Sequence, residues 1–133
     1  MKIENIKFKA KRFDNGEWVK GDLAHSLDGG LNIFGFTREN GVDYYSGVHL
    51  IDPSTICQFT GLKDCKGNEV WEGDMLSNVT NDSPDGIVVF KYGAFCLLAK
   101  NGRDFCVALT YLLSEKESLN RFKVIGNKFD KEK

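Results

Sequence analysis

Four acidic side chains lie close together in the middle of the chain, where clustered carboxylates could do two kinds of chemistry. They are Asp64, Glu69, Glu72 and Asp74. Paired carboxylates can act as general acid and base, or they can bind Mg²⁺ or Ca²⁺. The spacing differs from that of a calcium-binding loop, because Lys66 stands where such a loop needs a ligand. We therefore interpret these carboxylates as acceptors for the N–H groups of turns. A metal-assisted hydrolase that uses Glu69, Glu72 and Asp74 is a less favoured hypothesis, which ranks third after the two given at the end of this section.

The two histidines and four cysteines lack the neighbours that catalysis or metal binding would need. His25 lies in a glycine-rich loop and His49 follows a tyrosine-rich segment, and no nucleophile motif accompanies either. The cysteines show no C-x-x-C pair of the kind that binds zinc. We expect them to be buried, reduced thiols. The sequence thus predicts no catalytic residue, no metal and no cofactor, and whether the chain is an enzyme stays open.

A nucleic-acid-binding surface is a second kind of site that the sequence could form. The formal net charge is only −1, but basic residues are concentrated near both ends of the chain. Domains that bind single strands combine such cations with surface aromatic side chains. We expect Phe34 and Phe36 in the core, and only one of Tyr44 and Tyr45 exposed, because strand neighbours point to opposite faces. The candidates, which must meet on one face, are Lys7, Lys9, Lys11, Arg12, Lys123, Lys128, Tyr44 and Tyr45.

Short runs of alternating polarity separated by turn residues predict a mainly β fold that would position these side chains. Residues 6–11 alternate apolar and basic side chains, as in a half-exposed strand. Residues 14–16 (DNG) and 101–102 (NG) are strong hairpin signals. About ten strands follow one another at spacings of about 8–12 residues, which is typical of a barrel or sandwich. Residues 108–119 are the one helical candidate, where we expect one or two short turns.

The 133 residues suit one β domain over residues 1–129, or two lobes sharing a core (1–60 and 61–129), before a charged tail at 130–133. No run approaches the ~20 apolar residues of a membrane span. The first residues lack the apolar core of a signal peptide. We therefore expect a cytoplasmic protein that has no membrane partner.

The segment from Gln58 to Met75 contains the most specific sequence motif in the chain. Its two halves, QFTGLKD and GNEVWEGDM, resemble the signature of the YopX family of phage and prophage proteins. An opening IKFKA and a late VIGN are similar to the same family, so the resemblance covers nearly the whole chain. We expect the indole of Trp71 to be buried and Gly73 to have a positive φ. The motif positions are Gly61, Asp64, Gly67, Trp71, Glu72, Gly73 and Asp74.

The resemblance implies a fold with an SH3-like barrel, additional short strands and a bacterial or phage-infected host cell. It implies no reaction. The first hypothesis is accordingly a non-enzymatic module that acts through a protein partner or through self-association of exposed strand edges. The alternative is a weak binder of single-stranded or duplex nucleic acid that uses the basic termini and surface aromatics.

Overall fold

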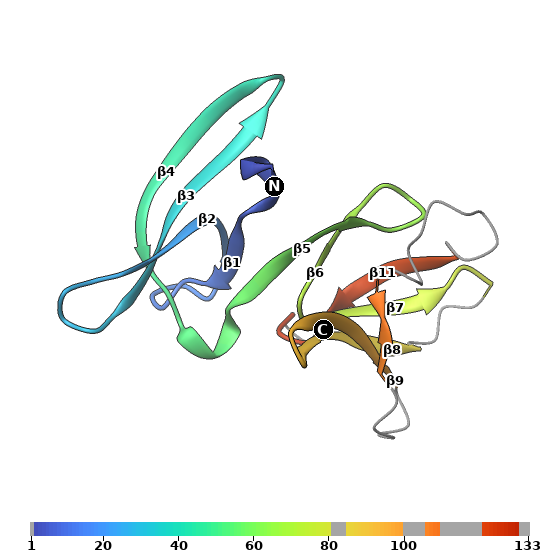
Figure 1. Cartoon of the computed structure of the whole chain (residues 1–133). Helices are drawn as coiled ribbons and strands as arrows, with labels where there is room; N and C mark the ends of the chain where they lie inside the picture. The colour runs from blue at the N-terminus through green and yellow to red at the C-terminus, as the bar shows by residue number, and fades with distance from the viewer. Residues whose placement is uncertain (1, 81–84, 100–105, 110–120, 131–133) are drawn as a thin grey trace. The chain divides into compact units, whose positions relative to one another are not determined.

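The computed structural model describes residues 2–80, 85–99, 106–109 and 121–130, and within them the chain is mainly β (Figure 1). The prediction of a mainly β chain is therefore confirmed. The described strands form two antiparallel sheets and no closed barrel. The chain divides into two compact units, Met1–Phe59 and Thr60–Lys133. Each unit is described by itself below.

The first unit is built from consecutive antiparallel hairpins. Its elements are two 3-10 turns, η1 (Ile3–Asn5) and η2 (Pro53–Thr55), and four strands, β1 (Phe8–Lys11), β2 (Trp18–His25), β3 (Leu31–Glu39) and β4 (Val42–Leu50). The predicted turn at residues 14–16 joins β1 to β2, and the Arg12 N–H donates to the Glu17 carbonyl across it at 2.8 Å. Asn40 and Gly41 both have positive φ (52° and 78°), as a tight two-residue hairpin requires, and they join β3 to β4.

One face of this sheet holds the core of the first unit. Ala10, Val19, Ile33 and Ile51 are buried there and pack together. Because successive side chains of a strand point to opposite faces, the residues between these core positions project from the other side of the sheet. We call that second side the outer face. On β1 to β4 it carries Lys9, Lys11, Trp18, Lys20, Asp22, Phe34, Phe36, Tyr45, Val48 and Leu50.

Strand β5 (Cys57–Lys63) carries the chain from the first unit to the second. Its first residues pair with β1, in the register Phe8 to Gln58 and Lys9 to Cys57. Its side chains alternate in burial, since Cys57 and Phe59 are buried while Gln58 and Thr60 are half-buried. The residues just before them form η2 and not the start of the strand, because the Asp52 side chain accepts from the Ser54 N–H and Pro53 begins the turn.

The second unit contains a five-stranded antiparallel sheet in the order β10-β9-β8-β7-β11. The strands of this unit are β6 (Glu69–Trp71), β7 (Asp74–Asn78), β8 (Gly86–Lys91), β9 (Ala94–Ala99), β10 (Cys106–Ala108) and β11 (Phe122–Asn127). The core of the unit is a cluster of five buried side chains. They are Val70, Leu76, Val88, Leu97 and Leu109.

The motif segment forms the turns that enclose β6. Trp71 is 3% exposed and Gly73 has a φ of 87°, so both expectations for these residues are confirmed. The Gly73 N–H donates to the Val88 carbonyl at 2.8 Å, and the Asp74 carboxylate accepts from the Trp71 N–H at 2.7 Å. These bonds fix the tight turn between β6 and β7.

Two sequence predictions lie outside the described residues. These are the turn at 101–102 and, beyond Leu109, the helical turns expected over 108–119. Among the described residues, no helix has the length and apolar character needed to cross a membrane.

Candidate functional site

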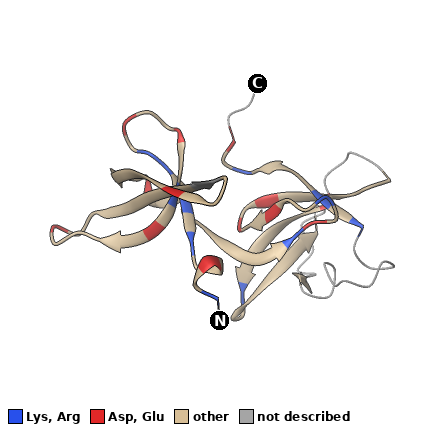
Figure 2. Ribbon diagram, turned by 90° about the horizontal axis from the view of Figure 1, so that it is seen from above, with Lys and Arg blue, Asp and Glu red and all other residues tan. Residues whose placement is uncertain are grey.

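Three of the eight candidate nucleic-acid-binding residues share the outer face of the first unit. The register of β1 and β2 puts Lys9 opposite Lys20 and Lys11 opposite Trp18. That of β3 and β4 puts Tyr45 opposite Phe36. Directly opposed residues of an antiparallel pair project to the same face. Lys9, Lys11 and Tyr45 therefore lie on one surface, and Figure 2 shows the basic positions that follow one another along β1.

The other five candidates lie elsewhere. Lys7 precedes β1, with its Nζ 4.7 Å from the centre of the Phe59 ring. Arg12 forms an ion pair with Asp14 at 2.8 Å, and Tyr44 lies opposite Thr37 on β3. Lys123 and Lys128 belong to the second unit.

The expected burial of the aromatic side chains was wrong at two places. Tyr44 and Tyr45 are both exposed, by 53% and 68%, because the far half of the β3–β4 hairpin extends beyond the core and faces solvent on both sides. Phe34 is 41% exposed because it lies on the outer face, while its neighbour Ile33 points into the core. Phe36 is half-buried.

A hollow of about 210 Å³ opens in the first unit where the ladder between β2 and β3 ends. The last paired residues are Gly21 and Gly35, although both strands continue beyond them. We call this space the sheet hollow. Its walls include Trp18 and Lys20 from β2, Phe36 from β3, and Ser46 and His49 from β4.

Two glycines and a bulge produce the sheet hollow. A Cβ at Gly21 would lie 1.9 Å from the Phe34 carbonyl oxygen, so the backbones meet too closely for any side chain. A Cβ at Gly35 would lie 2.1 Å from Ser46 Oγ. On β4, Ser46 is an extra residue between the pairs Gly35–Gly47 and Phe36–Tyr45, and Gly47 has a φ of 98°. Such a bulge bends the strand and re-aims nearby side chains, here Ser46 and His49.

We expect Gly21→Ala to destabilise the fold by about 1–3 kcal/mol, because the ladder must open to admit a methyl group against a backbone carbonyl. Urea unfolding followed by circular dichroism would measure the loss. Gly41→Ala is the matched control, since Gly41 has a φ of 78° but no atom within 4 Å of the added Cβ. Its cost comes from backbone strain alone, at about 1 kcal/mol. Equal losses for the two variants would contradict the close approach at Gly21.

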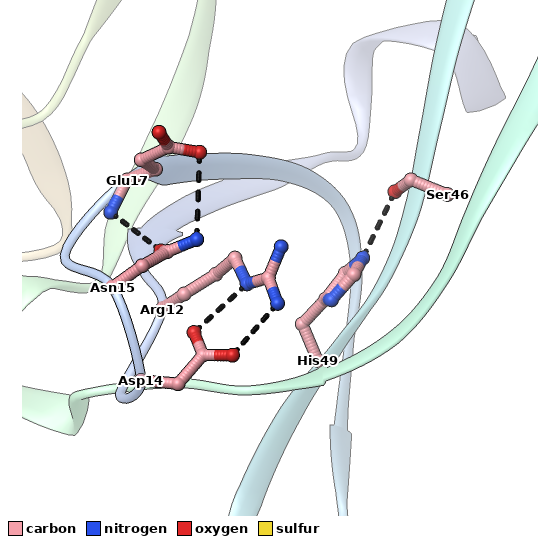
Figure 3. A network of polar contacts seen from close by, with 6 residues as sticks. All are labelled: Arg12, Asp14, Asn15, Glu17, Ser46 and His49. Carbon is pink, nitrogen blue, oxygen red and sulfur yellow. Dashed lines mark hydrogen bonds and ion pairs between the residues drawn. The ribbon is translucent and has the colours of Figure 1, made fainter.

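Polar contacts at the hollow's rim arise from neighbouring turn and strand residues (Figure 3). Arg12 Nε and Nη2 donate to the Asp14 carboxylate at 3.1 and 2.8 Å, and this guanidinium holds the pKa of Asp14 below its usual value. Because the folded-state pKa is depressed, the pair persists at neutral pH and is lost as the pH falls through that pKa. Asn15 Nδ2 donates to Glu17 at 3.4 Å. The Arg12–Asp14 ion pair and the Asn15–Glu17 hydrogen bond therefore stabilise the turn between β1 and β2 at the surface.

His49 and Ser46 form the one contact at the hollow that has the residue types of a nucleophile and its base. His49 Nε2 lies 3.1 Å from Ser46 Oγ. A working pair also needs a third group that orients the histidine. Within the described residues, no carboxylate is hydrogen-bonded to His49. The contact therefore supports the bulge and does not form a catalytic triad.

Two lysines of the outer face lie close to the Trp18 indole, and a third lines the sheet hollow. Lys9 Nζ and Lys11 Nζ lie 4.6 and 5.5 Å from the centre of the Trp18 ring, a range in which an aromatic face attracts a cation. Lys20 is exposed and stands directly opposite Lys9, although like charges in that position repel. We call Lys9, Lys11 and Lys20 the basic stripe.

An apolar surface adjoins the basic stripe on β3 and β4. Tyr45 packs edge-on against Phe34 and Phe36, with ring centres 5.4 and 6.5 Å apart. Val48 and Leu50, both exposed, continue the surface along β4, which is an edge strand of its sheet. We call these five residues the hairpin patch. At one end of the patch, the Phe13 N–H donates a hydrogen bond to the Leu50 carbonyl at 2.9 Å. A smaller hollow of about 160 Å³ adjoins Leu50.

Two of the four acidic side chains, Asp64 and Asp74, accept hydrogen bonds from N–H groups of the second unit. Asp64 is 4% exposed; its Oδ1 accepts from the Lys66 and Asn68 N–H groups at 2.9 and 2.8 Å, and its Oδ2 accepts from the Val124 N–H at 2.9 Å. Asp74 accepts from Trp71 and from Asn127 Nδ2. Within the described residues, no group of three potential ligands is placed to hold a metal ion. These contacts give Asp64 and Asp74 a turn-capping role.

Sequence reasoning missed the central members of the site, Trp18, Lys20 and Ser46. The available signal was the pair of isolated glycines inside strand patterns, Gly21 and Gly35. An isolated glycine within a strand often marks a bulge or a close backbone approach. That signal would have indicated an irregular sheet at this position, although not which side chains surround it.

The family model described as YopX protein matches residues 7–132. A search of curated proteins finds no match to the chain.

Proposed function

The chain belongs to the YopX family, and from that premise we propose that it is a non-enzymatic binding module that acts through contact with a protein partner or with further copies of itself. We also propose that the second unit contains the SH3-like part of the fold, and that the protein is of phage or prophage origin and works in a reducing cytoplasm. Cys57 and Cys96 are buried, as small apolar side chains are, which suits thiols that stay reduced.

The hairpin patch is the observation that carries this proposal. Its five apolar or aromatic side chains lie on one face of an edge hairpin, and Tyr45 and Val48 are each more than 60% exposed. Contiguous exposed apolar surfaces mark sites of protein–protein contact. An edge strand also offers unpaired backbone groups that can add a strand from another chain. β4 contains neither the lysine nor the proline that commonly blocks such addition.

The test is light scattering after size-exclusion chromatography, over a concentration series of the whole chain. We expect the apparent mass to rise above that of one chain. Val48→Lys should keep it at one chain, because an edge lysine opposes strand addition. Val79→Lys, at an exposed position of the second unit, is the matched control and should leave the mass unchanged.

A wild-type chain that stays single at every concentration would contradict self-association. The protein-partner reading would then depend on comparing what tagged wild-type and Val48→Lys chains retain from their native host extract. Equal recovery by the two chains would contradict the hairpin patch as a docking surface.

A second candidate function is weak nucleic-acid binding. One specific observation favours it, namely that Lys9 and Lys11 share the outer face with Tyr45. Cations beside exposed aromatic rings suit single-stranded nucleic acid. Lys123 and Lys128 lie in the second unit and are not needed for this version of the surface. Its binding should weaken with salt, as phosphate contacts require.

A further inference from the structure

We propose that the sheet hollow is a base-stacking site for single-stranded nucleic acid, with Trp18 and Phe36 receiving a base and the basic stripe contacting the phosphates on either side. This inference rests on the second candidate function and deepens it, because it names the site and the class of ligand. The nucleic-acid-binding surface proposed here is centred on β2, whereas the sequence placed it at the chain termini. Trp18, Lys20 and Phe36 join the residues involved.

The hollow has the walls that a flat aromatic group requires. Trp18 and Phe36 come from the two strands that part beyond Gly21 and Gly35, and both residues line the same space. A volume of about 210 Å³ is below that of pockets for drug-sized molecules, which hold about 300–1,000 Å³. It therefore suits one planar ring system and not a whole nucleotide. The rest of such a ligand must extend beyond the hollow.

Charge complementarity supplies the second part of the argument. Two ammonium groups are already held within 5.5 Å of the Trp18 ring centre, and a third, Lys20, lines the hollow itself. Arg12 and Glu17 also line the hollow, and Asp22 is the acidic residue that β2 adds to the outer face, so basic residues outnumber acidic ones at this site. A phosphate between Lys9 and Lys20, which are paired across β1 and β2, would contact two ammonium groups at once.

The geometry favours a single strand over a duplex. In a duplex, the flat faces of the bases are hidden by their neighbours, so aromatic side chains on a sheet cannot reach them. In a single strand every base has a free face that can stack on an aromatic ring, largely independent of sequence. A site that combines one stacking space with three cations therefore needs an unpaired base.

The test is fluorescence anisotropy of a labelled oligo-dT 15-mer titrated with the whole chain at low salt. Three phosphate contacts predict that a tenfold rise in salt weakens binding about 100-fold. Trp18→Leu should weaken binding about tenfold by removing the stacking surface, and Trp18→Phe should restore most of it. Lys9→Gln with Lys11→Gln should cut the salt dependence to about that of one contact. Circular dichroism on each variant shows whether the fold is kept.

Lys91→Gln provides a matched control. Lys91 Nζ also lies over an aromatic ring, 5.2 Å from the centre of Tyr92, but in the second unit. It should leave both affinity and salt dependence unchanged.

The possible failures are distinguishable. No binding of any oligonucleotide at low salt would overturn both the site and the second candidate function. If binding is found but folded Trp18→Leu binds as wild type does, the function survives and the stacking site is overturned. Equal affinity for a 15-base-pair duplex would also overturn it, since a duplex offers no free base.

Discussion

Replacing Trp71 by alanine should lower the free energy of unfolding by about 3–5 kcal/mol, the range for removing a large aromatic side chain from a core. The indole is 3% exposed, and β6, which carries it, is enclosed by the turns of the motif. Its neighbour Val70 is a member of the core of the second unit. A cavity of this size cannot be filled by small movements of the surrounding side chains. Urea unfolding followed by far-ultraviolet circular dichroism would measure the loss.

Trp18→Ala is the matched control, because Trp18 is the other tryptophan of the chain and is only half-buried. It lies on the outer face, where it lines the sheet hollow, so its loss widens an open hollow and leaves no closed cavity. We expect a cost of about 1–2 kcal/mol. An unchanged transition midpoint for Trp71→Ala, or a larger loss for Trp18→Ala, would contradict the assignment of Trp71 to the core.

The turns and the strand alternation were predictable from sequence because each depends on neighbours in the chain. The DNG turn at 14–16, the turn at Asn40 and Gly41 and the positive φ of Gly73 follow from residue types that accept those conformations. The burial of Cys57 and Phe59 follows from a period of two. The motif at 58–75 identified the family for the same reason, because its residues lie in one continuous segment of the sequence.

The outer face was not predictable, because its composition depends on which strands pair and in which register. Phe34 looks like a core residue in sequence, and it is exposed because Ile33 occupies the core side of β3. Tyr44 and Tyr45 are both exposed because the β3–β4 hairpin extends beyond the core. It does so because β3 and β4 are longer than β1 and β2. No local pattern reports how far neighbouring strands extend.

The sheet hollow depends on still less local information. It requires two glycines that meet across β2 and β3, and a residue inserted in β4 next to them. Each glycine is visible in the sequence, but their direct opposition is a consequence of the register. Trp18 and Phe36 are eighteen residues apart in the chain and come together only when both strands part. The stacking site proposed above could therefore be inferred only from the structure, and changing its two rings tests it.

Asp64→Asn should destabilise the fold by about 2–4 kcal/mol, although it removes only one charge and changes no volume. Both carboxylate oxygens accept backbone N–H groups, and one of these bonds joins the motif loop to Val124 in β11. An asparagine must turn an NH₂ group toward one of those N–H donors, so a buried donor is left without an acceptor. Thermal and urea unfolding would both report the loss.

Asp28→Asn is the control for Asp64→Asn, because Asp28 also accepts a backbone N–H in a turn, from Gly30 at 3.0 Å, but is exposed. An exposed asparagine can keep one acceptor oxygen in place and leave the other side to water. The midpoint should therefore move much less than for Asp64→Asn. If the two variants unfold at the same urea concentration, the buried carboxylate does not hold the motif loop to β11. The shape of that loop would then have to come from Gly67 and from the bond between the Cys65 N–H and the Phe122 carbonyl.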